Sequence, residues 1–426
     1  MHLIEGQVKK FNLNSILFLL LCIIPFALIW SRFLADFSLV LICIIFLIKK
    51  SFKLKNFFDN YFFKIFFVFW IIISLRSLFS EDIYFSLKSS LPFIRFAIFA
   101  LAIQYLVQDN SKRIFILLMI LSPLLCIVAA DALFQFYSGA NILGYPLPSL
   151  AGRLSGFFKD ELIIGSYIAR FSPILIGLYY YSKYLKYIRS NLDYYLIIFI
   201  FFLLLVVFCS GERVSTIYLI ISFCLLIFIL DAKLINKIIL TLTAITFLTL
   251  VIINSERIKE RLIFNTLEST NLVNQDTFNY KKLYIYSVAH HSHILAAYDI
   301  FKENILFGSG VKMFRKICDK RHNVNEYSCT THPHNLIMQF LSETGILGFL
   351  FYVLSLFYVL LKLLKIFKLK ILNKISDFHR CQFFFLTALL ISLFPILPSG
   401  SFFNNWIGII SFLPVGLYLS TIMKRN

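Results

Sequence analysis

Six of the eight histidines in this 426-residue chain fall in one polar stretch, residues 254–345. Imidazole changes charge near neutral pH, which makes histidine the usual general base in enzymes. A single histidine in such a stretch is more often a solvated or helix-capping residue, so the residue type alone assigns no role. The histidines of this stretch are His290, His291, His293, His322, His332 and His334.

The residues that follow His334 predict how its side chain is positioned. Pro333 disfavours helix in the residue before it, and the sequence after His334 has the period of an amphipathic helix that reaches about Thr344. Gly345 can end that helix in a left-handed conformation. A short helix that leads directly into an apolar span would lie at a membrane interface, with His334 at its start. Its polar stripe consists of Asn335, Gln339, Ser342 and Glu343.

Arginine and lysine are distributed differently along the chain. Lysine predominates in every second connection between apolar runs, whereas the runs themselves and the remaining short connections hold mostly arginine. The planar guanidinium group can engage two phosphate oxygens at once, which an ammonium group cannot. A charge deep in hydrocarbon normally faces a bundle interior or a wet cavity, although Arg76 and Arg213 could instead reach the lipid headgroups by snorkelling. The arginines of this second group are Arg32, Arg76, Arg95, Arg153, Arg170 and Arg213.

Two of the eight cysteines, Cys318 and Cys329, lie in the same polar stretch as the histidines. In an oxidising compartment outside a bacterial inner membrane, these two would form a disulfide. The alternative is a zinc site, which the ligand types allow, although the spacing matches no common zinc-binding pattern. That alternative would use Cys318, His322, Cys329, His332 and His334.

The sequence contains no glycine-rich phosphate loop, nucleophile elbow or dinucleotide fingerprint. We therefore expect any transfer reaction to use a substrate that is already activated, without a nucleotide or a metal cofactor. Because the outer face of an inner membrane has no ATP, the obvious activated donor there is a sugar linked to a lipid through a diphosphate.

The elements that position these residues are apolar helices. Hydrophobic residues make up 59% of the chain, charged residues only 15%, and the mean hydropathy is +0.82, whereas soluble domains hold about a quarter charged residues. A transmembrane helix needs roughly 20 mostly apolar residues. We find twelve such runs, which predict an all-α polytopic integral membrane protein; two runs are short, so eleven or thirteen spans also fit. The runs are about 13–30, 33–48, 61–79, 84–107, 113–137, 162–181, 194–209, 213–230, 235–253, 346–364, 380–397 and 402–420.

The basic connections predict the orientation of these spans. Lysine and arginine concentrate on the cytoplasmic side of membrane proteins, and here they fill every second connection as well as both terminal stretches. We therefore expect both termini to be cytoplasmic in a bacterial inner membrane. The chain then divides into nine spans over 1–253, one large periplasmic loop with short helices over 254–345, and three spans over 346–426. The first run lacks a small-x-small cleavage site and is interpreted as an uncleaved span.

Three short segments resemble the O-antigen ligase and polymerase superfamily. His334-Asn335, followed by Gly345-x-x-Gly348, is similar to the periplasmic signature of that superfamily. The segments that begin at Arg153 (Arg-Leu-Ser-Gly-Phe-Phe) and at Ser210 (Ser-Gly-Glu-Arg) resemble two further motifs. Each motif is weak alone, but all three occur in order on the predicted outer side, and the resemblance covers roughly residues 120–425.

The resemblance implies a membrane glycosyltransferase that moves a glycan from undecaprenyl diphosphate to an acceptor. Ligases use lipid A-core as the acceptor, and polymerases use another lipid-linked repeat unit. By this resemblance Arg153 and Arg213 hold the donor diphosphate, and His334 activates the acceptor hydroxyl or orients the donor. An inverting displacement needs a base near the acceptor and positive charge on the leaving diphosphate. The other predicted substrate-binding residues are Arg95, Arg170, Arg315, His291, His293, Asn335 and Glu343.

The chain departs from the ligase pattern at one position. Ligases carry an arginine some residues before the glycine pair that is Gly308 and Gly310 here, but the aligned stretch reads His-His-Ser-His over residues 290–293. Either one of these histidines or Arg315 takes that role, or the enzyme is not a strict ligase. We favour a ligase, with a polymerase as the alternative and a lipid-linked oligosaccharide transporter as the more remote one. A transporter should carry charges near the membrane midplane, whereas these charges cluster toward the outer face.

Overall fold

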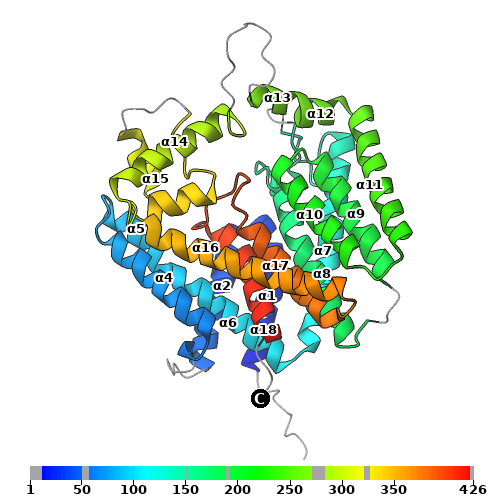
Figure 1. Cartoon of the computed structure of the whole chain (residues 1–426), viewed down its shortest axis with the longest axis horizontal. Helices are drawn as coiled ribbons and strands as arrows, with labels where there is room; N and C mark the ends of the chain where they lie inside the picture. The colour runs from blue at the N-terminus through cyan, green and yellow to red at the C-terminus, as the bar shows by residue number, and fades with distance from the viewer. Residues whose placement is uncertain are drawn as a thin grey trace, which may run out of the picture.

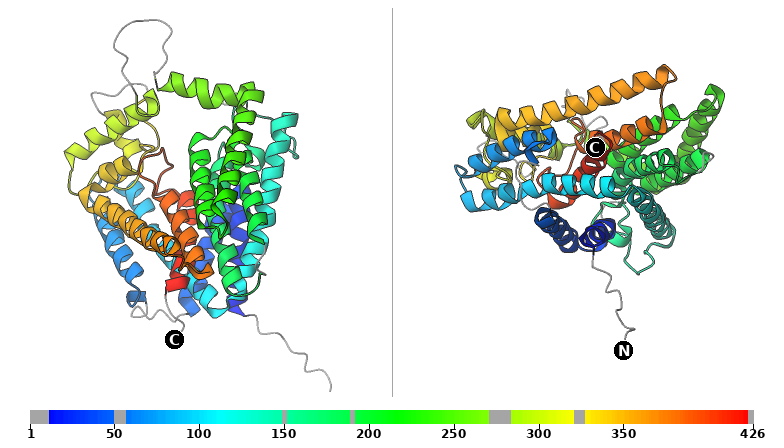
Figure 2. Two further views of the ribbon diagram at one scale, coloured as in Figure 1. Left: turned by 45° about the vertical axis from the view of Figure 1, so that its right-hand side comes forward. Right: turned by 90° about the horizontal axis from the view of Figure 1, so that it is seen from below.

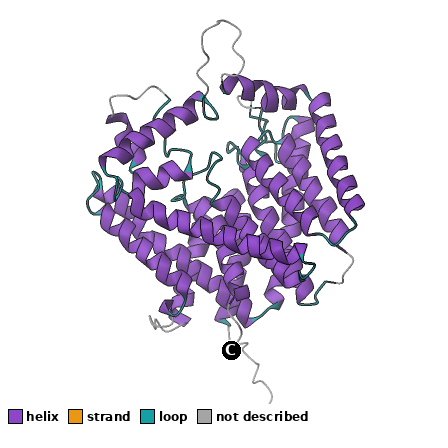
Figure 3. Ribbon diagram, viewed as in Figure 1, coloured by secondary structure: helices purple, strands orange, loops and turns teal. Residues whose placement is uncertain are grey.

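The computed structural model describes residues 12–49, 57–148, 152–188, 192–270, 284–320 and 327–422. Over these residues the named elements are all helices (Figure 3). They are α1 (Leu13–Trp30), α2 (Arg32–Lys49), α4 (Tyr61–Ser77), α5 (Ile83–Ser90), α6 (Ile94–Asp109), α7 (Lys112–Ser138), α8 (Ile164–Tyr184), α9 (Asp193–Cys209), α10 (Arg213–Ile229), α11 (Leu234–Asn254), α12 (Glu256–Lys259), α13 (Asn265–Ser269), α14 (Val288–Glu303), α15 (Phe314–Ile317), α16 (Leu336–Ile371), α17 (Asp377–Ser392) and α18 (Asn405–Ile422).

Each apolar run of the sequence falls on a helix, but the helices differ from the runs in three main places. The run predicted over 380–397 continues past the end of α17 at Ser392 into the 393–404 loop. The run predicted over 84–107 is divided into α5 and α6 by a 3₁₀ turn at Leu91–Phe93, which contains Pro92. The run predicted over 346–364 belongs to the 36-residue helix α16, which also includes the short amphipathic helix after His334. The break predicted at Gly345 is present as a kink inside α16, where Gly345 has φ 62°.

Six helices over the described residues are long and apolar enough to cross a membrane, and α9 and α10 are shorter apolar helices. A helical membrane protein is therefore supported, while the number of twelve spans stays a prediction. Helix α11 is the clearest case of a helix that faces outward, because Ala244 is its only buried residue. A helix that is apolar on all sides and unburied in protein has the surface that lipid requires.

Helices from distant parts of the chain pack in the centre of the molecule. Helix α17 packs along α8, and α18 packs along α6. Gly177 permits the first of these contacts, because a Cβ atom there would lie 2.5 Å from the ring of Phe385. Phenylalanine rings fill much of the remaining core, and Phe69 of α4 stacks on Phe351 of α16 with ring centroids 4.1 Å apart.

The described residues between 254 and 345 cover one end of the bundle, which we call the loop end. Figures 1 and 2 show α12 and α13 on one side of this end and α14 and α15 on the other, above the first part of α16. The first part of α16 is held by the 308–310 turn, where the backbone N–H groups of Ser309 and Gly310 donate to the carbonyls of Ser342 (2.8 Å) and Glu343 (2.9 Å). A Cβ atom at Gly308 would lie 2.5 Å from that backbone, so only glycine allows this approach.

Candidate functional site

Four of the predicted histidines form one cluster at the loop end. The ring of His334 lies at the centre, with its centroid 4.0 Å from His332, 5.4 Å from His293 and 5.6 Å from His290. The structure therefore brings together two pairs of histidines that are about forty residues apart in the sequence.

Helix α14 carries one of the two pairs, His290 and His293, and the cap at its N-terminus contacts the ring of His290. The hydroxyl of Ser287 caps α14 by accepting from the backbone N–H of His290, and it also lies 2.7 Å from Nδ1 of that ring. Residues three apart lie on the same face of a helix, so His290 and His293 point the same way. His293 is buried and donates from Nδ1 to the carbonyl of Ser328 at 3.1 Å.

The other pair lies in the turn before α16. His332 donates from Nε2 to the carbonyl of Ser399 (3.2 Å), and the backbone N–H of Ser399 donates to the carbonyl of His334 (2.8 Å). His334 has φ 54°, a conformation that side-chain-bearing residues rarely adopt. Such a strained residue is retained where the surrounding structure requires it, commonly at functional sites.

The environment of the cluster keeps the rings of His332 and His334 neutral. Burial, followed by the neighbouring histidines, lowers the pKa of His334 to about 3. Burial likewise lowers the pKa of His332 to about 4, with a further contribution from the positive charge of Arg315. A neutral imidazole has a free lone pair, so His334 can accept a proton at neutral pH.

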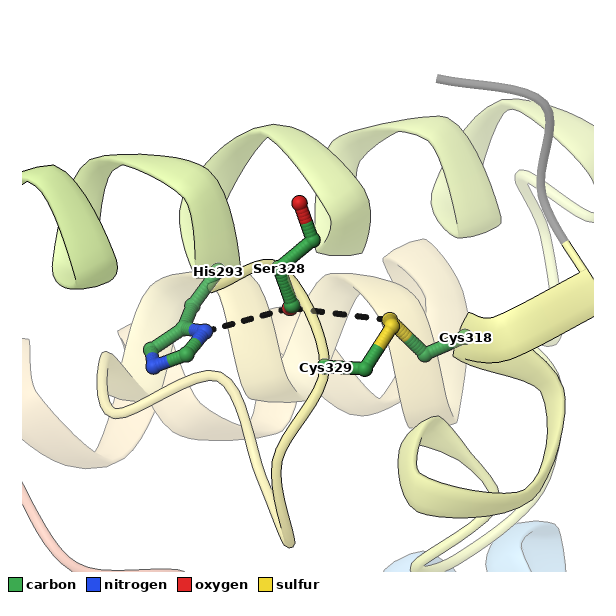
Figure 4. The surroundings of a disulfide bond; sticks show 4 residues. All are labelled: His293, Cys318, Ser328 and Cys329. Carbon is green, nitrogen blue, oxygen red and sulfur yellow. Dashed lines mark hydrogen bonds between the residues drawn. A yellow bond between two sulfur atoms is a disulfide. The ribbon is translucent and has the colours of Figure 1, made fainter. Parts of the chain in front are cut away.

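The structure joins Cys318 and Cys329 in a disulfide, which is the pairing that the sequence favoured over a zinc site. Figure 4 shows how this bond bears on the histidine cluster. The carbonyl of Ser328, next to Cys329, accepts from His293 and lies 3.5 Å from the sulfur of Cys318. The disulfide thus holds the backbone segment that orients His293. His322, a ligand in the alternative zinc site, lies outside the described residues.

Four other predicted site residues have contacts that position the backbone or the cluster. Asn335 caps α16 by accepting from the N–H of Met338 (3.1 Å). Glu343 is buried and accepts from Gln339 at 3.1 Å, within the packing against the 308–314 segment. His291 lies against the ring of Tyr284, with centroids 5.6 Å apart. Arg315 is exposed and lies over the ring of Phe85.

A second group of charges, from Arg153, Arg213 and Glu212, lies where α10 begins. Arg153 pairs with the carboxylate of Glu212 at 3.5 Å, and among the described residues the buried Nε atoms of Arg153 and Arg213 have no hydrogen-bond partner. Arg213 donates from Nη2 to the backbone carbonyl of Arg261 at 3.1 Å. Arg153 and Arg213, which the sequence motifs assign to the donor diphosphate, therefore lie close together.

Glu212 holds this turn in place by binding the start of α8. Its carboxylate accepts from the backbone N–H groups of Gly165 (2.7 Å) and Ser166 (3.0 Å) and from the hydroxyl of Ser215 (2.9 Å). Burial raises the pKa of Glu212, while Arg153 and these donors lower it. Among the described residues Glu212 is the one carboxylate paired with this group, so the positive charge of Arg153 and Arg213 exceeds the negative charge beside it.

Two other arginines predicted for the substrate site have different surroundings. Arg170 is buried in α8, one face of its guanidinium lies over the ring of Tyr218, and its Nη1 has no hydrogen-bond partner. Arg95 forms an ion pair with Asp36 of α2 at 2.8 Å. Arg170 thus lies beneath the start of α10, whereas Arg95 is engaged with a carboxylate and remains outside the arginine group.

The histidine cluster and the arginine group face each other across the loop end. The positive charge of Arg213 is close enough to contribute to the lowered pKa of His290, after burial and His293. In Figure 1 the start of α10 and α12 lie on one side, α14 and the start of α16 lie on the other, and the 393–404 loop passes between them. The histidine cluster and the arginine group are therefore neighbours at the loop end.

Two arginines near this site were missed by the sequence analysis, Arg257 and Arg261. They occur one helical turn apart directly after α11 and contact the turns that carry the arginine motifs. Arg257 donates to the carbonyl of Gly152 (3.2 Å), and Arg261 donates to the carbonyl of Gly211 (3.4 Å). The signal was available, because the preference for arginine over lysine in outer connections extends to residues 254–261.

Over the residues that the structure describes, no group of three or more His, Cys, Asp or Glu side chains is arranged to hold a metal ion. Residues 198–353 match the family model described as O-antigen ligase. The match begins within α9 and ends within α16, so it includes Arg213 and all four clustered histidines and excludes Arg153. No curated protein matches the sequence. This part of the chain is therefore similar to O-antigen ligase domains.

Proposed function

We propose that the protein transfers a glycan from undecaprenyl diphosphate to lipid A-core at the periplasmic face of the inner membrane. The observation that carries this proposal is that the histidine cluster, with a neutral His334 at its centre, lies near an arginine group in which only Arg153 pairs with a carboxylate. A neutral base and an excess of positive charge are what a displacement at an anomeric carbon needs. The family match supports the class of reaction.

In the proposed step, the acceptor hydroxyl oxygen attacks the anomeric carbon of the donor sugar. The bond between that carbon and the phosphate oxygen breaks, and its electron pair leaves with undecaprenyl diphosphate. His334 takes the proton of the attacking hydroxyl and later releases it to solvent. The guanidinium groups of Arg153 and Arg213 stabilise the charge that develops on the leaving diphosphate. The donor is already activated, so the step consumes no nucleotide.

The positions of the two groups determine the orientation of the substrates. His334 lies at the start of α16 and the arginines lie at the start of α10, so the acceptor approaches from the histidine side and the diphosphate from the arginine side. Holding both reactants in one geometry contributes much of the rate in bimolecular transfer. His332 and His293 act as positioning residues, because their ring hydrogen bonds to backbone carbonyls hold the cluster around His334.

The direct test is transfer by purified protein in lipid nanodiscs, with lipid-linked glycan as donor and lipid A-core as acceptor. We expect glycan-capped lipid A-core to form without nucleotide and in the presence of a chelator. No product from any donor and acceptor pair, or a reaction that a chelator abolishes, would contradict the proposal.

A polymerase is the second candidate, because the loop arginine of ligases is replaced by the His-His-Ser-His stretch at 290–293. The same assay distinguishes the two when lipid A-core is omitted. A ladder of longer lipid-linked chains from donor alone indicates a polymerase, whereas dependence on lipid A-core indicates a ligase.

The proposed location requires the loop end to be periplasmic and both termini to be cytoplasmic. Reporter fusions after residues 60, 190 and 370 should give cytoplasmic signals, and a fusion near 320 should give a periplasmic signal, because basic connections stay on the cytoplasmic side. A cytoplasmic signal at 320 would contradict both the topology and the proposed supply of donor from the periplasmic leaflet.

A further inference from the structure

The segment from Ser255 to Ser269 lies across the loop end of α9 and α10 (Figure 1). It consists of α12, a π-helical turn at Glu260–Phe264 and α13. Ile258 anchors it, being 1% exposed and packed with Phe208 and Cys209 of α9. Because this anchor is apolar, the segment is held in place independently of its arginines.

The two arginines of this segment have different surroundings. The guanidinium of Arg257 lies over the ring of Phe136, 5.5 Å from its centroid, and near the thiol of Cys209. Arg257 also donates to the carbonyl of Gly152, and its buried Nη2 has no hydrogen-bond partner among the described residues. Arg261 donates one hydrogen bond, from Nε to the carbonyl of Gly211 at 3.4 Å. Its two terminal nitrogens donate to no other described residue.

Two other arginines lie close to Arg261. After burial, the charge of Arg153 is the neighbour that lowers the pKa of Arg261, and Arg213 donates to its backbone carbonyl. Over the described residues no carboxylate pairs with Arg213 or Arg261, and Glu212 pairs only with Arg153. Like charges this close repel one another. An anion with several oxygens would relieve the repulsion by accepting hydrogen bonds from the guanidinium groups of Arg153, Arg213 and Arg261.

The backbone directs Arg261 to this position. A π turn inserts one extra residue into a helix, rotates the side chains that follow and often marks a functional position. Gly211 has φ 70°, and a Cβ atom there would lie 3.2 Å from Cγ of Arg261 and 3.1 Å from the carbonyl of Gly152. Glycine at 211 thus leaves the space in which the Arg261 side chain runs.

We infer that Arg261 is a third binding residue for the donor diphosphate, together with Arg153 and Arg213. Arg261 then supplies the positive charge that the 290–293 stretch lacks. The three guanidinium groups come from three separate segments: the 152–155 turn, the start of α10, and the π turn after α12. A diphosphate group is long enough to contact more than one of them, whereas a monophosphate has fewer oxygens to share. This inference rests on the proposed function.

The test measures equilibrium binding of farnesyl diphosphate, farnesyl monophosphate and inorganic pyrophosphate to the full-length protein in nanodiscs. The variants are Arg261→Gln, Arg261→Lys, Arg153→Gln and Arg213→Gln, with Arg257→Gln as the matched control one turn away. We expect Arg261→Gln to weaken binding of both diphosphates about 10- to 100-fold, the effect of losing a charged hydrogen bond. Binding of the monophosphate should weaken less, and Arg261→Lys should restore part of the diphosphate affinity.

The control separates binding from docking of the segment. Arg257→Gln should retain diphosphate affinity while lowering the thermal unfolding midpoint, because it loses the contacts with Gly152 and Phe136. Equal weakening by Arg257→Gln and Arg261→Gln would overturn the inference, since the segment as a whole would then be responsible. A loss confined to farnesyl diphosphate and absent for pyrophosphate would also overturn it, because Arg261 would then contact the isoprenoid chain.

Failure of this inference is distinguishable from failure of the proposed function. If Arg153→Gln and Arg213→Gln weaken diphosphate binding and Arg261→Gln does not, the proposed donor site is supported and Arg261 is not part of it. If none of the three changes the affinity, the donor site itself is wrong. Size-exclusion behaviour and unfolding midpoints of each variant show that an affinity loss is not a loss of fold.

Discussion

The two ends of the helical bundle both hold arginines, but these arginines have different partners. At the end opposite the loop end, Arg380 contacts Asp231 and pairs with Asp377 at 2.6 Å, and Lys370 also pairs with Asp231 at 2.6 Å. At the loop end, Arg213 and Arg261 have no carboxylate partner among the described residues, although the two ends are joined by the same helix, α10.

The difference shows that pairing, more than the number of charges, distinguishes a binding site from an architectural contact. A buried charge that is paired has its cost offset by its partner. A charge left unpaired at the edge of a bundle is costly and is retained where a ligand supplies the missing partner. We therefore expect substitutions at the loop end to reduce activity and equivalent substitutions at the opposite end to reduce stability.

The largest effect is expected for His334→Ala. Loss of a general base slows transfer about 100- to 10,000-fold, while diphosphate binding should remain largely intact because the arginines are unchanged. His332→Ala should have a smaller effect, since that ring positions His334 and does not accept the proton. The measurement is initial rate with purified protein, alongside binding of farnesyl diphosphate.

The matched control for His334→Ala is His379→Ala at the opposite end. His379 lies in the capping box of α17, where it accepts from the backbone N–H of Ser376. We expect normal transfer by this variant and a small loss of stability, since a cap contributes about 1 kcal/mol. Normal turnover by His334→Ala would remove the proposed base.

The second prediction compares Arg213→Gln with Arg380→Gln. Arg213→Gln should lower donor turnover about 10- to 100-fold and leave thermal stability unchanged or higher, because it removes an unpaired charge. Arg213→Lys, which keeps the charge but loses the planar fork, should restore only part of the activity. Arg380→Gln should leave transfer near normal and lower stability by about 1–3 kcal/mol, the cost of leaving its carboxylate partners unsatisfied. The opposite pattern would contradict the division between the two ends.

The third prediction concerns pH. Burial lowers the pKa of His334 to about 3, well below the ordinary histidine value of 6.5. A histidine with a depressed pKa stays neutral as pH falls, so His334 remains able to accept a proton at pH 5. An ordinary imidazole base would lose about 30-fold in activity between pH 8 and pH 5, because only about 3% of it would be neutral.

We therefore expect kcat/KM to fall much less than that over the same range. Donor binding measured at each pH controls for titration of the diphosphate itself. A decline of about 30-fold centred near pH 6.5, without a change in donor binding, would show that the base is an ordinary solvated imidazole.

The sequence predicted the elements of this molecule well, because the signals are local. An apolar run of sufficient length forms a helix whatever it packs against, and a glycine that must adopt positive φ predicts a break, as at Gly345. His334 and Arg213 could also be identified from the sequence, because the motifs that contain them span only a few residues. The short helix before Gly345 was also predicted, but its anchoring was not: after the break, the N–H groups of Ile346 and Leu347 donate to the carbonyls of Ile305 and Leu306, which the sequence cannot show.

The partners of charged residues could not be predicted in the same way. Arg95 pairs with Asp36, and the carboxylate of Glu343 accepts hydrogen bonds from the backbone at Lys312 and Phe314. Both contacts depend on how distant segments pack. Arg261 was overlooked for the same reason. Nothing in its local sequence shows that the π turn would direct its side chain at Gly211, so only the folded chain separates Arg261 from Arg257.

The smallest effect is expected for the disulfide. In a Cys318→Ser, Cys329→Ser double variant, the Ser328 carbonyl would lose the cross-link beside it and hold His293 less firmly. Closing a loop of this length contributes about 3 kcal/mol in the chain-entropy model. Without the disulfide, the 318–329 region should therefore open more readily while the helical bundle stays folded. Transfer should fall only a few-fold, because His293 acts on His334 through ring packing and does not take the proton.

Cys126→Ser, on the exposed side of α7, is the matched control and should change neither rate nor protease sensitivity. The comparison is sharpest in limited proteolysis, where reduced wild type and the double variant should be cut in the 318–329 region at the same rate, faster than oxidised wild type. Equal cleavage of all three would show that the disulfide does not hold this segment, and the link from Cys329 through Ser328 to His293 would then have to be abandoned.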